Sequence, residues 1–232
     1  MSAQFRGPPN SGNGGYVCGR LAGRLAGPVR CVLRAPIAID TPLHVVRSAD
    51  GARLLDLDGA LIAEAGPGDA ADLPSPPACP SLEAAEAAAA RFVGLARPFH
   101  PVCFTCAEAL DEGFGLRVFV GQVEGAAEGV VAGPWTPHAN FAGGDGLASV
   151  EALWAALDCP GSVAWVVQGG GGGLLGTMTC EILRKPAVGE TCIVMAWPIE
   201  ASGRKRAAGT ALFSAAGELM ARSRQIWIGR AV

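Results

Sequence analysis

The chain is poor in the residue types that mark several large functional classes. Charged residues make up only 17% of its 232 residues, and the formal net charge is −3. Because binding to nucleic acid or to an anionic membrane surface usually requires concentrated positive charge, we expect neither role. No apolar run approaches the roughly 20 residues that a membrane-spanning helix needs, and residues 1–15 lack the apolar core of a signal peptide. These absences predict a soluble cytoplasmic protein.

Histidine is scarce, with three residues, whereas there are eight cysteines. A disulfide framework is not expected in a cytosolic chain of this size. Cys103 and Cys106 form a close pair and His100 precedes them by three residues, so these residues could bind zinc. A redox pair is a second reading, without the βαβ context that such pairs usually have. Since no second pair stands at zinc-ribbon spacing, we favour a tight turn with buried thiols and expect no metal.

Half of the residues are hydrophobic, which is enough for a substantial core. The chain opens on a polar turn that runs into a helix with a glycine at every fourth position: Gly15, Gly19, Gly23 and Gly27. Each glycine inside a helix is about 1 kcal/mol less favourable than alanine. The stripe therefore predicts that another part of the backbone lies close against this helix.

Alternation and turn residues predict two similar arrays of β-strands. Asp-Gly pairs at 50–51 and 58–59 are strong hairpin signals. The strands expected in the first half are 29–39, 41–50, 52–58 and 60–66, and four more are expected after the glycine run at 169–173. Between the arrays we expect a Pro-rich linker at 67–80, an alanine-rich helix at 81–96, a hairpin over 115–123 and 129–137, and a helix at 149–161.

The helix at 149–161 has clear expected ends. Ser149 can cap its start, and Pro160-Gly161 should stop it. Asp158 would then lie in the last turn, where a carboxylate opposes the helix dipole and gains nothing structurally.

The two halves of the chain resemble each other weakly. Leu33-Arg34 and Pro36 recur 150 positions later as Leu183-Arg184 and Pro186. Each half reads as one helix followed by four antiparallel strands, which predicts an α+β fold in which a curled sheet cradles a long helix, twice. We expect a first half at 1–66, a linker with the alanine-rich helix at 67–98, and a second half at 99–232.

Three short motifs resemble the thioesterase superfamily, whose members have the hotdog fold. Residues 103–119, CFTCAEALDEGFGLRVF, are similar to the stretch that opens many of its domains, although Ala107 replaces a glycine and the usual Asn-Pro is absent. Residues 154–161, WAALDCPG, resemble the central-helix segment that carries the catalytic acid. Residues 13–16, NGGY, resemble the family's His-Gly-Gly, with Asn13 in place of histidine. The resemblance implies a fused double hotdog in which each sheet wraps around a central helix, and the closing sheet would explain the glycine stripe.

In family members with His-Gly-Gly, the acid follows nine positions later on the same helix. Here Ala22 stands nine positions after Asn13, and Ser149 stands nine positions before Asp158. Each helix thus carries half of the expected machinery. Since family sites lie across the seam between paired hotdogs, the resemblance implies one composite site in each chain.

The composite site would join Gly14 and Gly15 to Asp158. Unpaired N–H groups at a helix start, at the positive end of the dipole, could hold a thioester carbonyl. Asp158 would then act as a general base on water or as a nucleophile. The expected substrate-binding residues around the mouth are Asn10, Ser11, Asn13 and Tyr16.

Simpler readings of the same residues stay open. Asp158 lies seven positions after Glu151 and could belong to a solvated polar stripe, and Asn13-Gly14-Gly15 could be only a turn before a tightly packed helix. Arg20 and Arg24 could meet coenzyme A phosphates or be surface charge.

The favoured function is acyl-CoA hydrolysis without a cofactor, with an acyl-CoA or another acyl thioester as partner. A catalytically silent acyl-CoA or lipid-binding protein is the alternative. A hydratase ranks last because no histidine lies near either helix start. A homodimer of double hotdogs is also expected.

Overall fold

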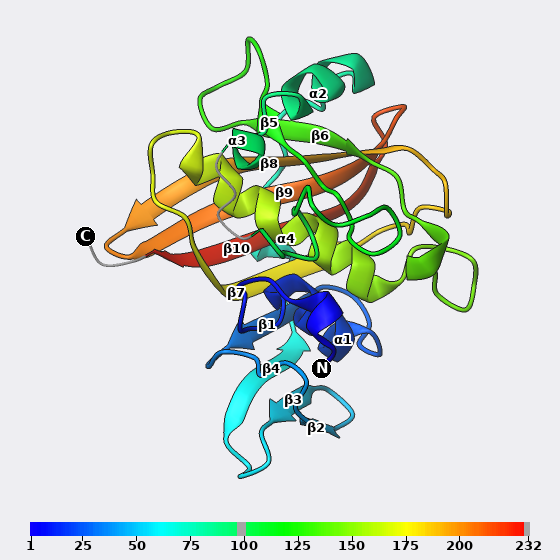
Figure 1. Ribbon diagram of the computed structural model, residues 1–232, viewed down its shortest axis with the longest axis vertical. Helices are drawn as coiled ribbons and strands as arrows, with labels where there is room; N and C mark the ends of the chain where they lie inside the picture. The colour runs from blue at the N-terminus through cyan, green and yellow to red at the C-terminus, as the bar shows by residue number, and fades with distance from the viewer. Residues whose placement is uncertain (97–100, 230–232) are drawn as a thin grey trace.

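The computed structural model describes residues 1–96 and 101–229, which form a single antiparallel sheet with helices packed on it (Figure 1). Within these residues the strand order is β2-β3-β4-β1-β7-β10-β9-β8-β6-β5. The strands are β1 Val29–Leu33, β2 His44–Arg47, β3 Ala52–Leu55, β4 Leu61–Pro67, β5 Gly121–Gln122, β6 Val131–Trp135, β7 Gly173–Ile182, β8 Cys192–Ser202, β9 Lys205–Ser214 and β10 Leu219–Gly229. The helices are α1 Gly14–Ala22, α2 Leu82–Ala89, α3 Val93–Ala96 and α4 Val150–Val166, with short 3₁₀ turns at Ala3–Phe5, Ala70–Asp72 and Ala139–Phe141.

Two helix-and-sheet units meet where β1 pairs with β7. These strands run antiparallel, with Cys31 opposite Met178, so the four N-terminal strands extend the C-terminal sheet without a break. Both predicted Asp-Gly hairpins are confirmed, since residues 50–51 connect β2 to β3 and residues 58–59 connect β3 to β4. The α+β prediction of a large antiparallel sheet with few helices is therefore confirmed.

The repeated Leu-Arg motifs occupy equivalent places in the two units. The first copy, Leu33-Arg34, overlaps the end of β1, and the second copy, Leu183-Arg184, directly follows β7. The N–H of Arg34 donates to Ile62 O at 2.8 Å, and the N–H of Arg184 donates to Met220 O at 3.0 Å. Each acceptor belongs to the last strand of its own unit, so the weak sequence repeat coincides with a repeated hydrogen-bonding pattern.

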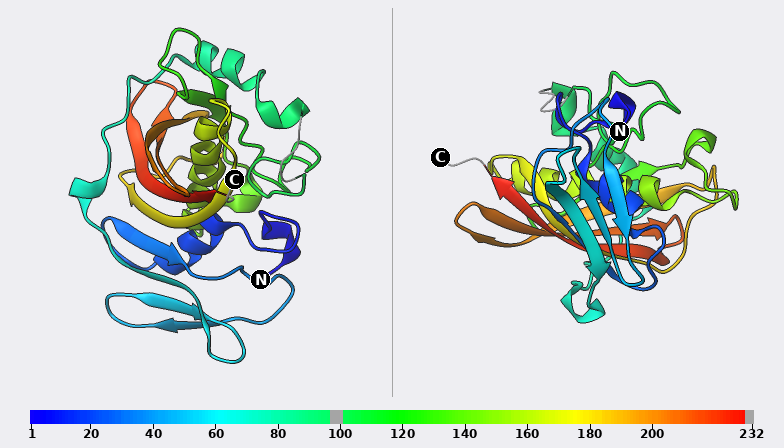
Figure 2. Two further views of the ribbon diagram at one scale, coloured as in Figure 1. Left: turned by 90° about the vertical axis from the view of Figure 1, so that its left-hand side faces the viewer. Right: turned by 90° about the horizontal axis from the view of Figure 1, so that it is seen from below.

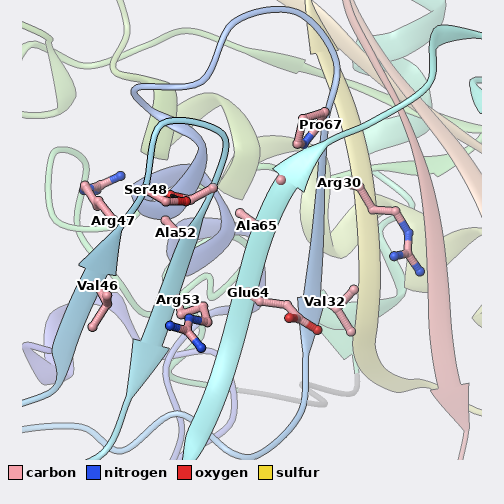
Figure 3. A pocket seen from close by; sticks show the side chains of 12 residues that line it. Arg30, Val32, Val46, Arg47, Ser48, Ala52, Arg53, Glu64, Ala65 and Pro67 are labelled. Carbon is pink, nitrogen blue, oxygen red and sulfur yellow. Dashed lines mark hydrogen bonds between the residues drawn. The ribbon is translucent and has the colours of Figure 1, made fainter.

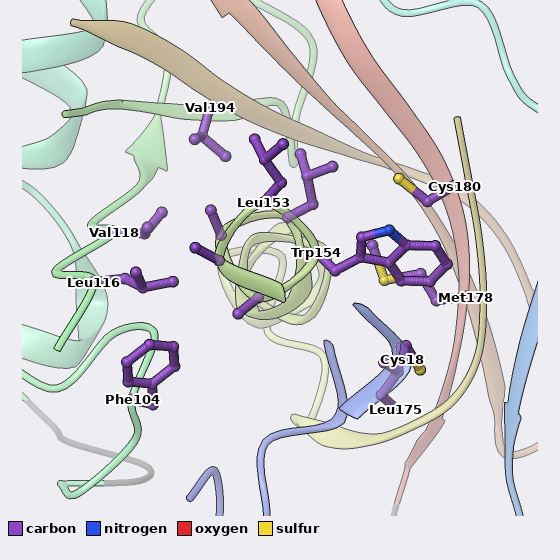
Figure 4. Close-up of a cluster of buried hydrophobic side chains, with 14 of the residues drawn as sticks. Cys18, Phe104, Leu116, Val118, Leu153, Trp154, Leu175, Met178, Cys180 and Val194 are labelled. Atoms are coloured by element: carbon purple, nitrogen blue, oxygen red, sulfur yellow. The ribbon is translucent and has the colours of Figure 1, made fainter. Parts of the chain in front are cut away.

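Helices α1 and α4 lie on one face of the sheet, which curves around α4 (Figure 2). The core around α4 includes Leu153 and Trp154 from the helix and Met178 and Val194 from the sheet (Figure 4). On the opposite face, alternate residues of β8 form a second apolar cluster with Ala85 and Ala88 of α2. The part of the sheet formed by β6, β8 and β9 is thus buried on both faces. No helix in the described part of the chain is both long and apolar enough to cross a bilayer.

The prediction that Pro160-Gly161 stops the second central helix is wrong. Helix α4 continues to Val166, so Asp158 lies in its interior rather than in its last turn. Proline lacks an N–H and disturbs the hydrogen bonding of the preceding turn. The buried amide of Gln225 donates to Leu157 O at 2.6 Å and so ties this part of α4 to β10. The absence of a side chain at Gly161 leaves room for this amide, because a Cβ there would lie 1.9 Å from Gln225 Oε1.

Other predicted boundaries also change. The alanine-rich helix of 81–96 divides into α2 and α3, and the strand expected at 115–123 is reduced to β5 at Gly121–Gln122. The other predicted strands are present, but most begin or end a few residues from the expected positions, and the strand expected at 29–39 ends at Leu33. Tertiary contacts, which local patterns do not contain, determine these ends.

The glycine stripe has a different cause from the one expected. A Cβ on Gly15 would lie 2.6 Å from Trp154 O, and a Cβ on Gly19 would lie 2.7 Å from the Cα of Glu151. The backbone that closes onto α1 is therefore that of α4, not that of the sheet. Gly23 is the C-cap, and Gly27 lies beyond the helix with a φ of +70°. Only the first two glycines serve the close crossing.

Candidate active site

The start of α1 touches the middle of α4 at one polar contact. The backbone N–H of Gly15 donates to Asp158 Oδ2 at 2.9 Å across 143 positions of sequence. The helices run in opposite directions, because Gly15 lies against Trp154 and Asp158 whereas Gly19 lies against Val150 and Glu151. This crossing brings the predicted acid to the predicted helix start.

Asp158 is buried, with 3% of its surface exposed. The reading of this residue as part of a solvated stripe is therefore wrong. Burial raises the pKa of Asp158 to about 7, because the charged form loses water; the hydrogen bond from Gly15 acts in the opposite direction. Its Oδ1 atom is buried without a hydrogen-bond partner among the described residues. A buried polar atom of this kind is unfavourable unless a ligand or a water molecule satisfies it.

The Asn13 side chain caps α1 and also connects α1 to α4. Its Oδ1 accepts from the N–H of Tyr16 at 2.8 Å, which satisfies one of the free donors of α1. Its Nδ2 donates to Thr105 Oγ1 at 3.2 Å, and the Thr105 hydroxyl donates to Ala155 O at 2.9 Å. The side chain thus ties α1 to α4 through the Cys-Phe-Thr-Cys segment. Thr105 was missed from the sequence, although it stands inside that motif.

The other predicted residues around the helix start have separate surroundings. The Ser11 hydroxyl accepts from the N–H of Ile37 at 3.0 Å, and Asn10 is exposed on the preceding turn. The ring of Tyr16 stacks on Phe5 with centroids 4.1 Å apart. Gly14 lies against Leu33 and Leu175, at the seam between β1 and β7. Of the predicted set, Gly15 is hydrogen-bonded to Asp158, and Asn13 is connected to α4 through Thr105.

Three cysteines converge beside Asp158. The Sγ atoms of Cys103, Cys106 and Cys159 all lie within 4.8 Å of one another, and those of Cys103 and Cys159 are 3.5 Å apart. Hydrogen bonds from Cys106 and Cys159 hold the pKa of Cys103 well below its usual range. Cys159 was missed from the sequence because it comes from another element. His100, the third ligand considered there, lies outside the described residues.

The crossing of α1 and α4 has two ends, which we call its poles. Gly15 meets Asp158 at one pole, and an ion pair lies at the opposite pole. Arg20 Nη1 lies 3.0 Å from Glu151 Oε1, where the start of α4 meets the end of α1. Ser149 caps α4 by accepting from the N–H of Ala152 at 3.2 Å, and Ala22 is buried at the end of α1. This pole lacks a Gly-Gly start and an acid nine positions after an N-cap.

Two surface pockets lie away from Asp158. The larger, of about 400 Å³, is on the outer side of the N-terminal strands, where Arg30, Arg53 and Glu64 line it (Figure 3). The smaller, of about 270 Å³, is bordered by Arg117, Trp135 and His138. Neither of these two pockets is bordered by Asp158, which is itself buried.

Comparisons with proteins of known structure identify the fold of this chain. No protein-family model matches the chain, and no curated protein matches it. A solved hotdog-fold protein of unknown function from Alicyclobacillus acidocaldarius is 12% identical, with a TM-score of 0.65 over 100% of this chain and 92% of that one. The tesB protein of Mycobacterium avium subspecies paratuberculosis is 17% identical, with a TM-score of 0.60 over 96% of this chain and 89% of that one. The chain therefore has the hotdog fold, the fold of thioesterase-superfamily proteins.

Proposed function

We propose that this chain is a double-hotdog, acyl-CoA thioesterase-like protein that hydrolyses an acyl thioester at a composite site between its two halves. One observation carries the proposal: the Gly15 N–H, at the start of one central helix, donates to the buried carboxylate of Asp158 on the other. The contact joins the two kinds of group that thioester hydrolysis needs, an amide donor for an oxyanion and a carboxylate for a proton.

The division into two hotdog halves rests on the repeated architecture. Each unit has a central helix, and the Leu-Arg motif makes the same kind of backbone bond in both. We keep the boundaries 1–66 and 99–232 for the halves and 67–98 for the linker. A homodimer of such chains stays a prediction.

The proposed reaction begins when the thioester carbonyl oxygen approaches the N–H groups of Gly14 and Gly15. In the structure the Gly15 N–H is held by Asp158, so the carbonyl would take over this donor. Asp158 would remove a proton from water as the water oxygen attacks the carbonyl carbon. The tetrahedral intermediate would then collapse by breaking the C–S bond, and the leaving thiolate would recover the proton. The products are a carboxylic acid and a free thiol.

Two observations favour a second candidate, a silent protein that binds acyl thioesters without turning them over. Asp158 is only 3% exposed, and neither of the two pockets reaches it. Asn13 is also engaged in capping, and an amide cannot transfer a proton as histidine does. The two functions differ in turnover rather than in ligand.

The experiment that tests the proposal is hydrolysis of a panel of acyl-CoAs by the wild type and by Asp158→Asn. General-base catalysis typically contributes about 10²–10⁴-fold to a rate, so we expect the variant to lose at least about a hundredfold in kcat. Glu151→Gln is the matched control, because it removes the acid at the other pole of the crossing and should retain activity.

Two outcomes would reject this mechanism. Full turnover by Asp158→Asn would move the chemistry to other residues. Tight acyl-CoA binding with no turnover by the wild type would establish the silent protein instead.

A further inference from the structure

The thiols of Cys103, Cys106 and Cys159 lie together, whereas a tight turn with a buried Cys-x-x-Cys pair accounts for only two of them. Cys103 and Cys106 are contributed by one loop, and Cys159 reaches them from α4, 56 residues after Cys103. A single disulfide would use two of the three sulfurs and leave the third unexplained. Three thiols that converge from two elements can serve as ligands of one metal ion.

The spacing of the sulfurs fits a tetrahedral cation. Zinc–sulfur bonds are about 2.3 Å long, which separates the sulfurs of a tetrahedral site by about 3.8 Å. The Sγ atoms here lie within 4.8 Å of one another, and one pair is 3.5 Å apart. Small side-chain rotations would therefore bring all three to a common ion.

A carboxylate with an unsatisfied oxygen stands beside the cluster. Asp158 precedes Cys159 on α4, and its carboxylate interacts electrostatically with Cys103. Its Oδ1 is buried without a hydrogen-bond partner in the described structure. A buried carboxylate oxygen of this kind is unfavourable unless a ligand or a water molecule satisfies it.

We infer that Cys103, Cys106 and Cys159 form a binding site for a thiophilic divalent cation, with Zn²⁺ as the expected ion. The three thiols release their protons on binding, and the thiolates coordinate the ion. A water molecule takes the fourth position, and Asp158 Oδ1 would accept a hydrogen bond from it. This arrangement accounts for the third cysteine and for the unpaired carboxylate oxygen together.

The site would fasten the loop of the Cys-x-x-Cys pair to the central helix. The same loop receives the Asn13 amide through Thr105, and the N–H of Phe104 donates to Arg6 O at 2.8 Å. The cation would therefore hold together the segment around Arg6, the loop and α4 next to Asp158. This structural role does not require thioester hydrolysis.

The test is a titration of the reduced, metal-free full-length chain with Co²⁺, followed by displacement with Zn²⁺. We expect one equivalent of Co²⁺ per chain, with the thiolate-to-cobalt charge-transfer absorption that marks sulfur ligation, and loss of that absorption when Zn²⁺ is added. Elemental analysis of protein purified with zinc present should give one zinc per chain. These readouts are separate from acyl-CoA turnover, so failure of either proposal can be recognised without the other.

Variants locate the site. Cys159→Ser should weaken Co²⁺ binding at least tenfold and remove most of the charge-transfer absorption, and Cys106→Ser should do the same if Cys159→Ser does not fold. Cys192→Ser is the matched control, because Cys192 is fully buried and its thiol donates to Glu190 O, which a serine hydroxyl can also do. It should bind one equivalent.

Three results would overturn the inference. The first is wild-type protein that binds no Co²⁺. The second is a Cys159→Ser variant that binds as tightly as the wild type. The third is a disulfide between Cys103 and Cys159 in metal-loaded protein, identified by mass spectrometry.

Discussion

The starts of α1 and α4 are built alike, and the residues that follow them differ. Asn13 caps α1 by accepting from Tyr16, and Ser149 caps α4 by accepting from Ala152, three positions later in both cases. Nine residues after the cap, α1 has the buried methyl of Ala22 and α4 has the buried carboxylate of Asp158. The Gly-Gly helix start thus belongs to α1, and the buried carboxylate belongs to α4.

The two poles of the helix crossing show the consequence of this division. At one pole the Gly15 N–H meets Asp158, and at the other Arg20 meets Glu151 in an ion pair. The first contact is buried, whereas the Arg20 side chain is 63% exposed. One pole is therefore a candidate site and the other is a surface contact, and substitutions can test whether that difference is functional.

The largest effect on this comparison is expected from Gly15→Ala. The added Cβ would lie 2.6 Å from both Trp154 O and Asp158 Cβ, so the helices must separate. Overpacking of this kind typically destabilises a protein by about 1–3 kcal/mol. We expect that loss in urea unfolding, and at least a tenfold loss of acyl-CoA turnover, because the Asp158 carboxylate leaves its donor.

Gly19→Ala tests whether crowding between α1 and α4 alone lowers activity, because Gly19 does not contact Asp158. Its Cβ would lie 2.7 Å from the Cα of Glu151, so a similar loss of about 1–3 kcal/mol is expected at the pole without the carboxylate. Turnover should stay within about threefold of the wild type. If Gly19→Ala reduced activity as strongly as Gly15→Ala, the two poles would not differ in the way proposed.

Much of this arrangement could be predicted from local signals. The Asp-Gly turns specify two hairpins, and Ser149 marks the start of α4, because turn and cap preferences depend on neighbouring residues. Asp158 was chosen as the candidate acid because its segment resembles a family motif, and its catalytic role stays a prediction. The glycine stripe indicated a close backbone approach but not which backbone approaches.

The remaining features depend on contacts far apart in the chain. Helix α4 continues past Pro160 and is tied to β10 there, since Gln225, 68 residues after Leu157, donates to the Leu157 carbonyl. Cys159 joins the Cys103 pair only through folding. Neither contact leaves a pattern in its own segment, so reading one segment at a time could not find it.

A smaller effect is expected from removing the two caps. Asn13→Ala and Ser149→Ala should each destabilise the chain by about 0.5–2 kcal/mol, since each leaves a helix N–H without its partner. Only Asn13→Ala should also reduce turnover, because Asn13 additionally braces α1 to Thr105 beside the candidate site. Urea unfolding and acyl-CoA assays on both variants measure the two effects separately. Equal losses of turnover would contradict a site at one pole only.

The smallest effect is expected from breaking the ion pair with Arg20→Ala. The Arg20 side chain is 63% exposed, and exposed ion pairs contribute about 0–1 kcal/mol because water screens them and ordering the side chains opposes them. Unfolding should therefore shift little, and less at high salt, where the pair is already screened. Turnover should match the wild type, since the pair lies at the pole opposite Asp158. A large loss of activity would mean that Arg20 contacts the substrate, which would favour the reading in which this arginine meets the phosphates of coenzyme A.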